Sequence, residues 1–90
     1  MNFCAIAMYN VFIEKAVYKQ LKNVPEKDYQ KIMASIASLA NDPRPLGCKK
    51  LKGRPGYRIR EGNYRVIYEI NDKILTVTVI EAGDRKDIYD

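Results

Sequence analysis

The side chains best suited to chemistry in this chain are a dense group of arginines and lysines near its middle. Residues 44–65 hold eight basic side chains and a single acid, Glu61, whereas the net charge of the whole chain is +5. Arginine presents a planar fork of N–H donors that matches two oxygens of a phosphate group. Such a block is typical of a surface that binds a polyanion, although a solvated basic loop has the same composition. The eight residues are Arg44, Lys49, Lys50, Lys52, Arg54, Arg58, Arg60 and Arg65.

The chain contains no histidine, which removes the usual general base of enzymes and the usual zinc ligand. Its two cysteines, Cys4 and Cys48, are too few for a disulfide framework and favour a reducing cytoplasm. No apolar run approaches the roughly 20 residues that a membrane-spanning helix needs. We therefore expect a cytoplasmic protein without a metal site or a membrane segment, in which any proton transfer uses a less common group.

The pattern of residues 57–66 in and beside the basic block predicts a hairpin with arginines on one face. Side chains alternate across a strand, so in residues 57–60 Arg58 and Arg60 point to the same side. A two-residue turn at residues 61–62 would place Arg65 opposite Arg58. Like charges opposite each other destabilise a sheet by up to about 1 kcal/mol, so we expect an anion to bind between them. The alternative is that these arginines only keep an exposed sheet face soluble. The expected core face holds Tyr57, Ile59, Tyr64 and Val66.

The elements that must position these arginines follow from the hydrophobic periodicity. Residues 9–13 are β-branched and aromatic, which predicts a first strand. Apolar residues recur at helical spacing through residues 14–24 and again through residues 29–40, which predicts two consecutive helices. Residues 42–56 contain three of the four prolines and three of the five glycines, so we expect a long loop there.

The rest of the chain alternates like a sheet, and the connections between its strands are short enough for hairpins. The three expected strands are residues 57–60, 63–70 and 74–82. The order predicts an α+β fold (β-α-α-β-β-β), in which a helical hairpin packs on a small antiparallel sheet. A chain of 90 residues allows one domain, which we assign to residues 8–90. Residues 1–7 form an N-terminal extension of unknown role.

The chain resembles the RelE/ParE superfamily of bacterial and archaeal toxins, and most closely its RelE branch, the ribosome-dependent messenger RNA interferases. The resemblance covers residues 8–90 and is carried by LKNVPEKDYQKI, NDPRP, KKLKG, GYRIREGNYRVIYEI and AGDRKDIY. It implies a RelE-like fold and the toxin of a type II toxin–antitoxin system, an endoribonuclease that cleaves messenger RNA in the ribosomal A site. It further implies a RelB-like antitoxin that wraps around the toxin, and operator DNA bound only by the toxin–antitoxin complex.

The resemblance also implies roles for individual residues. The family's catalytic positions fall on Arg58, Arg60, Arg65, Arg85 and Tyr89. Contacts with ribosomal RNA are implied for Lys49, Lys50, Lys52, Arg54 and Lys86. This chain departs from many relatives because the basic pair on the first hairpin strand is Arg58 and Arg60 instead of lysine, and because Asp84 replaces a histidine. Arginine stays protonated, so the identity of the general base is open.

The implied chemistry needs no metal. The ribose 2′-hydroxyl attacks the adjacent phosphate, which gives a 2′,3′-cyclic phosphate and a free 5′-hydroxyl. Clustered arginines would stabilise the charge of the phosphorane, often the largest catalytic contribution. They would also favour the phenolate form of a nearby tyrosine. Tyr89 is thus the first choice for proton transfer, with Arg60 or Lys86 as alternatives.

Two other classes of function remain open. A ParE-like toxin, which inhibits gyrase, would need the same fold but not the set of Arg65, Arg85 and Tyr89. A non-catalytic nucleic-acid-binding module would also be basic, but the chain has no helix-turn-helix pattern, and its basic groups lie on a sheet and a loop. A toxin that has lost its activity is a further alternative.

Overall fold

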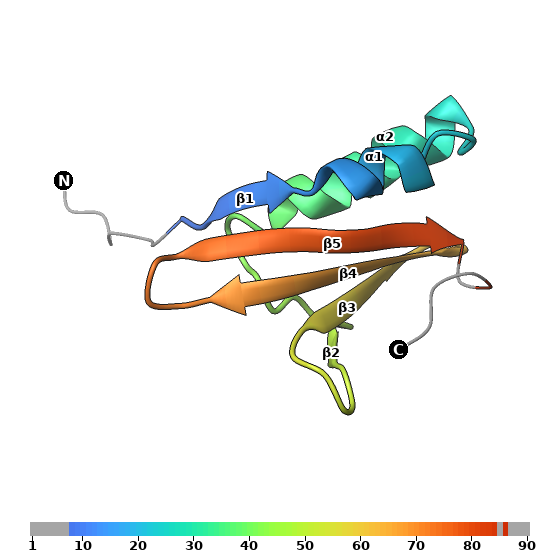
Figure 1. Cartoon of the computed structure of the whole chain (residues 1–90). Helices are drawn as coiled ribbons and strands as arrows, with labels where there is room; N and C mark the ends of the chain where they lie inside the picture. The colour runs from blue at the N-terminus through green and yellow to red at the C-terminus, as the bar shows by residue number, and fades with distance from the viewer. Residues whose placement is uncertain (1–7, 85, 87–90) are drawn as a thin grey trace, which may run out of the picture.

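Two helices lie over one face of a twisted five-stranded sheet in the computed structural model, which describes residues 8–84 and Lys86 (Figure 1). The elements in chain order are β1 (Asn10–Ile13), α1 (Lys15–Gln20), α2 (Glu26–Ser38), β2 (Lys49–Lys50), β3 (Tyr57–Glu61), β4 (Tyr64–Asn71) and β5 (Thr76–Asp84). The α+β order of a strand, two helices and a C-terminal meander of strands is confirmed.

The sheet has the strand order β1-β5-β4-β3-β2, and it is mixed, not wholly antiparallel. Strands β2 to β5 pair antiparallel as expected, but β1 adds to β5 in parallel, with Asn10 opposite Thr76. A parallel pair needs a long crossover between its strands, and here the helices and the meander supply it. The short strand β2 was not expected, because two residues carry no periodicity that a sequence pattern could show.

The first helix is shorter than its apolar stripe predicts. It ends at Gln20, and the backbone turns until Pro25, which precedes the first residue of α2. Proline disfavours helical geometry in the residue before it, so Val24 cannot continue α1 into α2. The second helix opens with Glu26 and Asp28 in its first turn, where a negative charge interacts favourably with the helix dipole.

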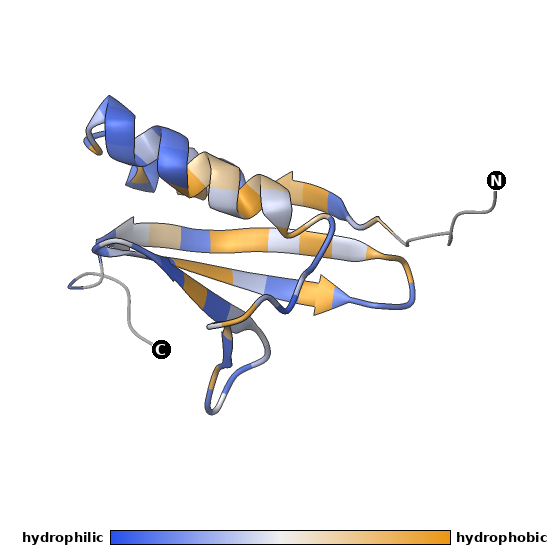
Figure 2. Ribbon diagram, turned by 180° about the vertical axis from the view of Figure 1, so that it is seen from behind, coloured by the Kyte–Doolittle hydropathy of each residue, from blue (hydrophilic) through white to orange (hydrophobic). Residues whose placement is uncertain are grey.

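The core lies between the helices and the facing side of the sheet. Figure 2 shows hydrophobic stretches on the strands and on the helix that lies over them. The buried residues of this cluster are Val17, Leu21, Ile32, Ile36 and Leu39 from the helical half, and Ile59, Val66, Tyr68, Val77, Val79 and Ala82 from the sheet. Ile59 and Val66 are on the face predicted for them, and Tyr57 and Tyr64 pack half-buried at its margin.

The register of the β3–β4 hairpin differs from the predicted one. Arg65 lies opposite Arg60, and Arg58 lies opposite Ile67, because the turn is at Gly62 and Asn63 instead of one residue earlier. Gly62 has φ +60°, a left-handed conformation that glycine adopts without steric cost. Moving the turn by one residue moves the register by two, so every side chain keeps its predicted face.

Strand β5 contains a bulge that changes which side chains face the core. Ile67 pairs with Glu81 while the next residue, Tyr68, pairs with Val79, so Ile80 is an extra residue. Ile80 packs with Leu51 and Ile67 in a second small cluster, separate from the main core. The sheet face away from the helices, which we call the outer face, therefore carries an apolar patch of its own.

Tyr68 provides a test of how the long loop is tied to the sheet. Its ring is fully buried, and its hydroxyl donates a 2.7 Å hydrogen bond to the Pro43 carbonyl. Burial raises the pKa of this phenol, so it stays protonated and able to donate. We expect Tyr68→Phe to lower the free energy of unfolding by about 1–3 kcal/mol, because a buried carbonyl loses its partner. Urea unfolding measures this loss. The exposed Tyr18 supplies the control, and equal losses in Tyr68→Phe and Tyr18→Phe would contradict the account.

Candidate nucleic-acid interface

Three arginines share the outer face of the sheet. Arg58 and Arg60 are on β3, two residues apart, and Arg65 is on β4 directly opposite Arg60. Arg58 is only 8% exposed, and it is the buried charged residue among those that the structure describes. The core residues alternate with these arginines along both strands, so the packing of the core fixes the direction in which the arginines leave the sheet.

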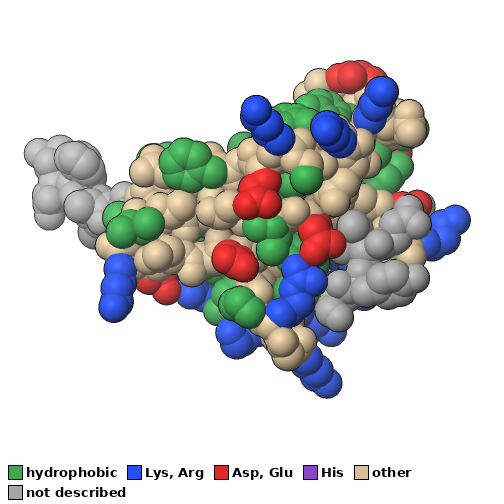
Figure 3. Space-filling model, in the orientation of Figure 1, with side chains coloured by type: hydrophobic (Ala, Val, Ile, Leu, Met, Phe, Trp, Pro, Cys, Tyr) green, Lys and Arg blue, Asp and Glu red, His purple; other side chains and the backbone are tan. Residues whose placement is uncertain are grey.

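A pocket of about 370 Å³ lies beside these arginines, and most of its lining is basic. Strand β2 forms one side of it, since Lys49 pairs with Arg58 and Lys50 pairs with Tyr57. Figure 3 shows Lys and Arg side chains gathered around the lower part of the molecule, near the β2–β3 connection. The lining residues are Lys49, Lys50, Leu51, Lys52 and Arg58. Four cationic side chains around one concavity suit a phosphate or a similar anion.

The loop between β2 and β3 is folded back against the sheet. The Leu51 amide donates a 3.0 Å hydrogen bond to the Gly56 carbonyl, and the Leu51 side chain is buried against Ile67. Gly56 has φ +123°, and a Cβ atom there would come within 3.0 Å of the Tyr68 carbonyl oxygen. Only glycine fits this position, so the chain can turn tightly from the loop into β3.

An ion pair holds the far side of the same loop. The Arg54 guanidinium Nη2 lies 2.9 Å from Oε1 of Glu81 on β5, and both side chains are about one-third exposed. Arg54 is predicted to contact RNA, but in this structure it contacts the protein. The loop is thus attached to the sheet by an apolar anchor at Leu51 and by a charged one at Arg54.

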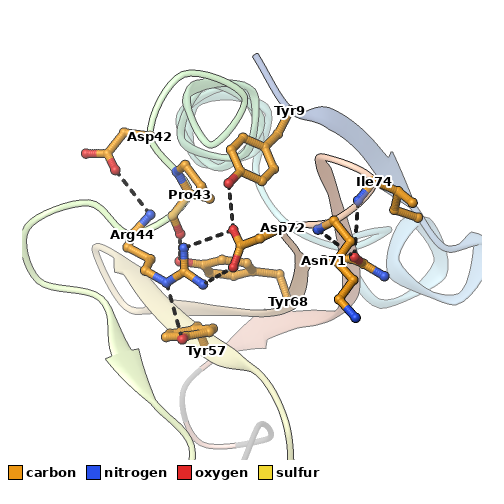
Figure 4. Close-up of polar contacts among 10 residues, drawn as sticks. Tyr9, Asp42, Pro43, Arg44, Tyr57, Tyr68, Asn71, Asp72 and Ile74 are labelled. Atoms are coloured by element: carbon orange, nitrogen blue, oxygen red, sulfur yellow. Dashed lines mark hydrogen bonds and ion pairs between the residues drawn. The ribbon is translucent and has the colours of Figure 1, made fainter. Parts of the chain in front are cut away.

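A second charged network joins segments far apart in the chain (Figure 4). Arg44 makes two hydrogen bonds to the Asp72 carboxylate, at 2.9 and 3.3 Å, and one of 3.3 Å to the Tyr57 hydroxyl. The Tyr9 hydroxyl donates to Asp72 at 2.6 Å. Both Arg44 and the Lys50 ammonium lie within about 5.3 Å of the centre of the Tyr57 ring. Arg44 belongs to the basic block, yet it acts here as a structural clamp.

Sequence reasoning missed this network because nothing local signals it. Asp72 is 28 residues from Arg44 and 63 from Tyr9, and an Asn-Asp sequence between two strands indicates only a turn. The Arg44 hydrogen bonds lower the pKa of Asp72, and the Tyr9 bond lowers it further. The clamp therefore depends on an ionised Asp72.

Two of the predicted site residues, Arg85 and Tyr89, lie outside the described residues. Lys86 is described and exposed, and its amide donates a 2.9 Å hydrogen bond to the Asp84 carboxylate. Asp84 lines a small pocket with Gln20 and Tyr64 on the helical side of the sheet, away from the outer face. The structure brings Arg58, Arg60 and Arg65 to one face of the sheet, with Arg58 beside the lysines of β2.

No cluster of His, Cys, Asp and Glu side chains able to hold a metal ion occurs within residues 8–84. No helix in that part of the chain is long and apolar enough to cross a membrane. The described outer face offers cations, an apolar patch and the carboxylates of Glu69 and Glu81. That combination suits the binding of a phosphate chain by preorganised positive charge.

Residues 11–89 match the family described as the ParE toxin of type II toxin–antitoxin systems. The chain belongs to the RelE/ParE family of toxins. It is 38% identical over 86 residues to toxin RelE3 of Methanocaldococcus jannaschii, covering 89% of this chain and 94% of that toxin. This confirms the resemblance read from the sequence, and it places the chain among the RelE toxins.

Solved RelE structures have the same fold. The archaeal RelE–RelB complex of Pyrococcus horikoshii OT3 contains a chain that is 31% identical, with a TM-score of 0.78, covering 90% of this chain and 99% of that one. The RelB–RelE complex of Methanococcus jannaschii contains one that is 34% identical, with a TM-score of 0.68, covering 88% and 95%. The RelE-like fold is thus confirmed.

The Arg44–Asp72 clamp predicts a specific dependence of stability on pH. A carboxyl group whose pKa is lowered by folding stabilises the protein above its unfolded pKa, about 3.9. This stabilisation is lost as the pH falls through the lower, folded-state pKa. We expect Asp72→Asn to unfold at lower urea than the wild type at pH 7, and the difference to shrink towards pH 3. Urea unfolding at both pH values measures it.

The matched control is Glu14→Gln, at an exposed residue whose side chain makes no hydrogen bond at the start of α1. It should leave the urea midpoint at pH 7 unchanged. A deficit of Asp72→Asn that is the same at pH 3 and pH 7 would show that charge is not what the clamp contributes.

Proposed function

We propose that this RelE toxin is a ribosome-dependent endoribonuclease, which cleaves messenger RNA in the ribosomal A site and thereby inhibits translation. The observation that supports it most is the set of three arginines on the outer face beside the lysine-lined pocket. Arg60 and Arg65 oppose each other across two strands, which places two guanidinium groups where one anion can contact both. A phosphate of the messenger is the anion that the proposed reaction supplies.

The reaction is attack of the ribose 2′-hydroxyl on the adjacent phosphate. The 2′-oxygen forms a bond to phosphorus, the bond to the 5′-oxygen breaks, and the products carry a 2′,3′-cyclic phosphate and a 5′-hydroxyl. Arg58, Arg60 and Arg65, with Arg85, stabilise the negative charge that develops on the phosphorane. Arg58 is nearly buried and held by the sheet, so it needs little reorganisation to act on that charge.

The proton transfers favour a group that gains and loses a proton more readily than an arginine guanidinium does. Tyr89 is our first assignment for proton transfer, with Lys86 and Arg60 as alternatives. No metal or cofactor enters this scheme. Positioning of the messenger by the ribosome supplies the in-line geometry of the attack.

The remaining basic residues serve to bind the ribosome. Lys49, Lys50 and Lys52 line the pocket beside Arg58, and their charges suit the phosphates of ribosomal RNA. Arg54, which is paired with Glu81, and the exposed Lys86 add further positive charge. Binding through many phosphate contacts weakens steeply as the salt concentration rises.

The partner of this toxin is a cognate antitoxin. The archaeal relatives of known structure are described as RelE–RelB complexes, and we extend that association to this chain. A RelB-like antitoxin would cover the basic face and keep the toxin inactive in the cytoplasm. The toxin–antitoxin complex, and not the toxin alone, would then bind operator DNA.

Primer extension on a messenger translated by purified ribosomes tests the proposal. We expect wild-type toxin to cut at A-site positions with ribosomes present and to leave naked RNA intact. Arg65→Ala should cut about 10²–10³-fold more slowly, the usual effect of removing one charge-stabilising donor. Lys22→Ala, on the helical side of the molecule, removes the same charge and should cut at the wild-type rate. An intact messenger with wild-type toxin and ribosomes would contradict the proposal.

The match to the ParE family supports a second candidate, a toxin that binds gyrase instead of cutting RNA. A supercoiling assay with purified gyrase distinguishes the two. Inhibition of supercoiling together with an intact messenger would favour the ParE-like function, whereas active gyrase with a cut messenger favours the interferase.

A further inference from the structure

The outer face carries a carboxylate whose position the proposed mechanism has not used. Among the described residues, two carboxylates lie on that face of the sheet, Glu69 and Glu81. Glu61 instead bonds to Ser35 of α2 on the helical side. We propose that Glu81 is the general base that accepts the proton of the 2′-hydroxyl, an inference that rests on the proposed function.

The bulge in β5 is what places Glu81 on this face. Val77 and Val79 are fully buried in the core, and regular alternation would put Glu81 on their side of the sheet. The extra residue, Ile80, reverses the alternation, so that Ala82 enters the core and Glu81 faces outward. Bulges occur beside active sites because they redirect a side chain.

The register places Glu81 next to the arginines. Glu81 pairs with Ile67, and on the other side of Ile67 the next strand carries Arg58. Arg65 is two residues before Ile67 on the same face, so it is the diagonal neighbour of Glu81, at a typical separation of roughly 7–8 Å. This separation is large enough for a phosphate and its ribose to bind between the carboxylate and the guanidinium groups.

The ion pair with Arg54 fixes the side chain of Glu81. Its Oε1 atom accepts from Arg54 at 2.9 Å, and the Glu81 side chain remains 32% exposed at the surface that RNA would contact. A carboxylate can accept a proton at neutral pH, whereas a protonated guanidinium cannot. Arg54 therefore orients the group while Oε2 receives the proton.

The step balances as follows. Oε2 of Glu81 takes the proton of the 2′-hydroxyl as the 2′-oxygen bonds to phosphorus. The bond from phosphorus to the 5′-oxygen breaks, and the departing oxygen takes a proton from water, which makes the 5′-hydroxyl. Glu81 then returns its proton to water, so neither an oxidant nor a metal takes part.

Single-turnover cleavage of ribosome-bound messenger, at a saturating concentration of toxin, tests this role. Removing a general base usually costs 10²–10⁴-fold, so we expect Glu81→Gln to cut at least about 100-fold more slowly than wild type. Glu69→Gln makes the same change on the same face, four residues along β4 from Arg65, and should cut within about twofold of wild type. Arg54→Ala breaks the ion pair but keeps the carboxylate. Its cleavage rate should saturate at a higher toxin concentration than that of wild type, and the saturated rate should be at least about tenfold higher than that of Glu81→Gln.

Two measurements distinguish a variant that has lost catalysis from one that has lost its folded structure. The thermal unfolding midpoint of each variant shows whether it is folded. In Glu81→Ala, added formate should restore part of the cleavage rate, because a small carboxylate can occupy the vacated position.

Three results would overturn the assignment: Glu81→Gln cutting within about threefold of wild type, Arg54→Ala saturating at the rate of Glu81→Gln, or a folded Glu81→Ala that formate does not restore. The failures of the two proposals are distinguishable. A wild-type toxin that leaves the messenger intact contradicts the proposed function, whereas wild type and Glu81→Gln cutting alike contradicts only the role of Glu81.

Discussion

Packing of the core on one face of a small sheet fixes three like charges on its other face. Arg60 and Arg65 oppose each other across β3 and β4, and Arg58 emerges two residues away on the same face. Packing on the opposite face holds them there, because Ile59 and Val66, which are their neighbours along the two strands, are buried in the core. The strands cannot rotate to separate the charges without exposing the core. Positive charge is thus concentrated by the fold on one face, where it favours the binding of an anion.

The basic block of the sequence divides into two groups once the chain is folded. Arg44 and Arg54 form ion pairs with Asp72 and Glu81, and these pairs attach the long loop at both ends. The other basic residues remain at the pocket and on the outer face. Part of the charge therefore stabilises the surface on which the rest acts. This division explains why a block with such charge density can have a defined structure.

The sequence predicts which face of the sheet each strand residue occupies, but not which residue lies opposite it on the next strand. Alternation assigns Arg58 and Arg60 to one face, and the assumption of a short turn adds Arg65; the structure bears this out. The register could not be predicted, because composition does not show whether the turn is at residues 61–62 or one residue later. In the structure it is one residue later, with Gly62 in a left-handed conformation. The parallel pairing of β1, the Arg44–Asp72 clamp and the bulge at Ile80 depend on contacts between segments far apart in the chain, which local patterns cannot show.

On this histidine-free surface, we propose, the 2′-hydroxyl attacks a phosphate held among the arginines. The most direct test is a ribosome-bound messenger with a single 2′-deoxynucleotide immediately 5′ of the scissile phosphate. We expect the toxin to cut the all-ribose messenger, leaving a 2′,3′-cyclic phosphate, and to leave the substituted bond intact. Cleavage of the 2′-deoxy bond at the same rate would contradict it, because the nucleophile would then be water.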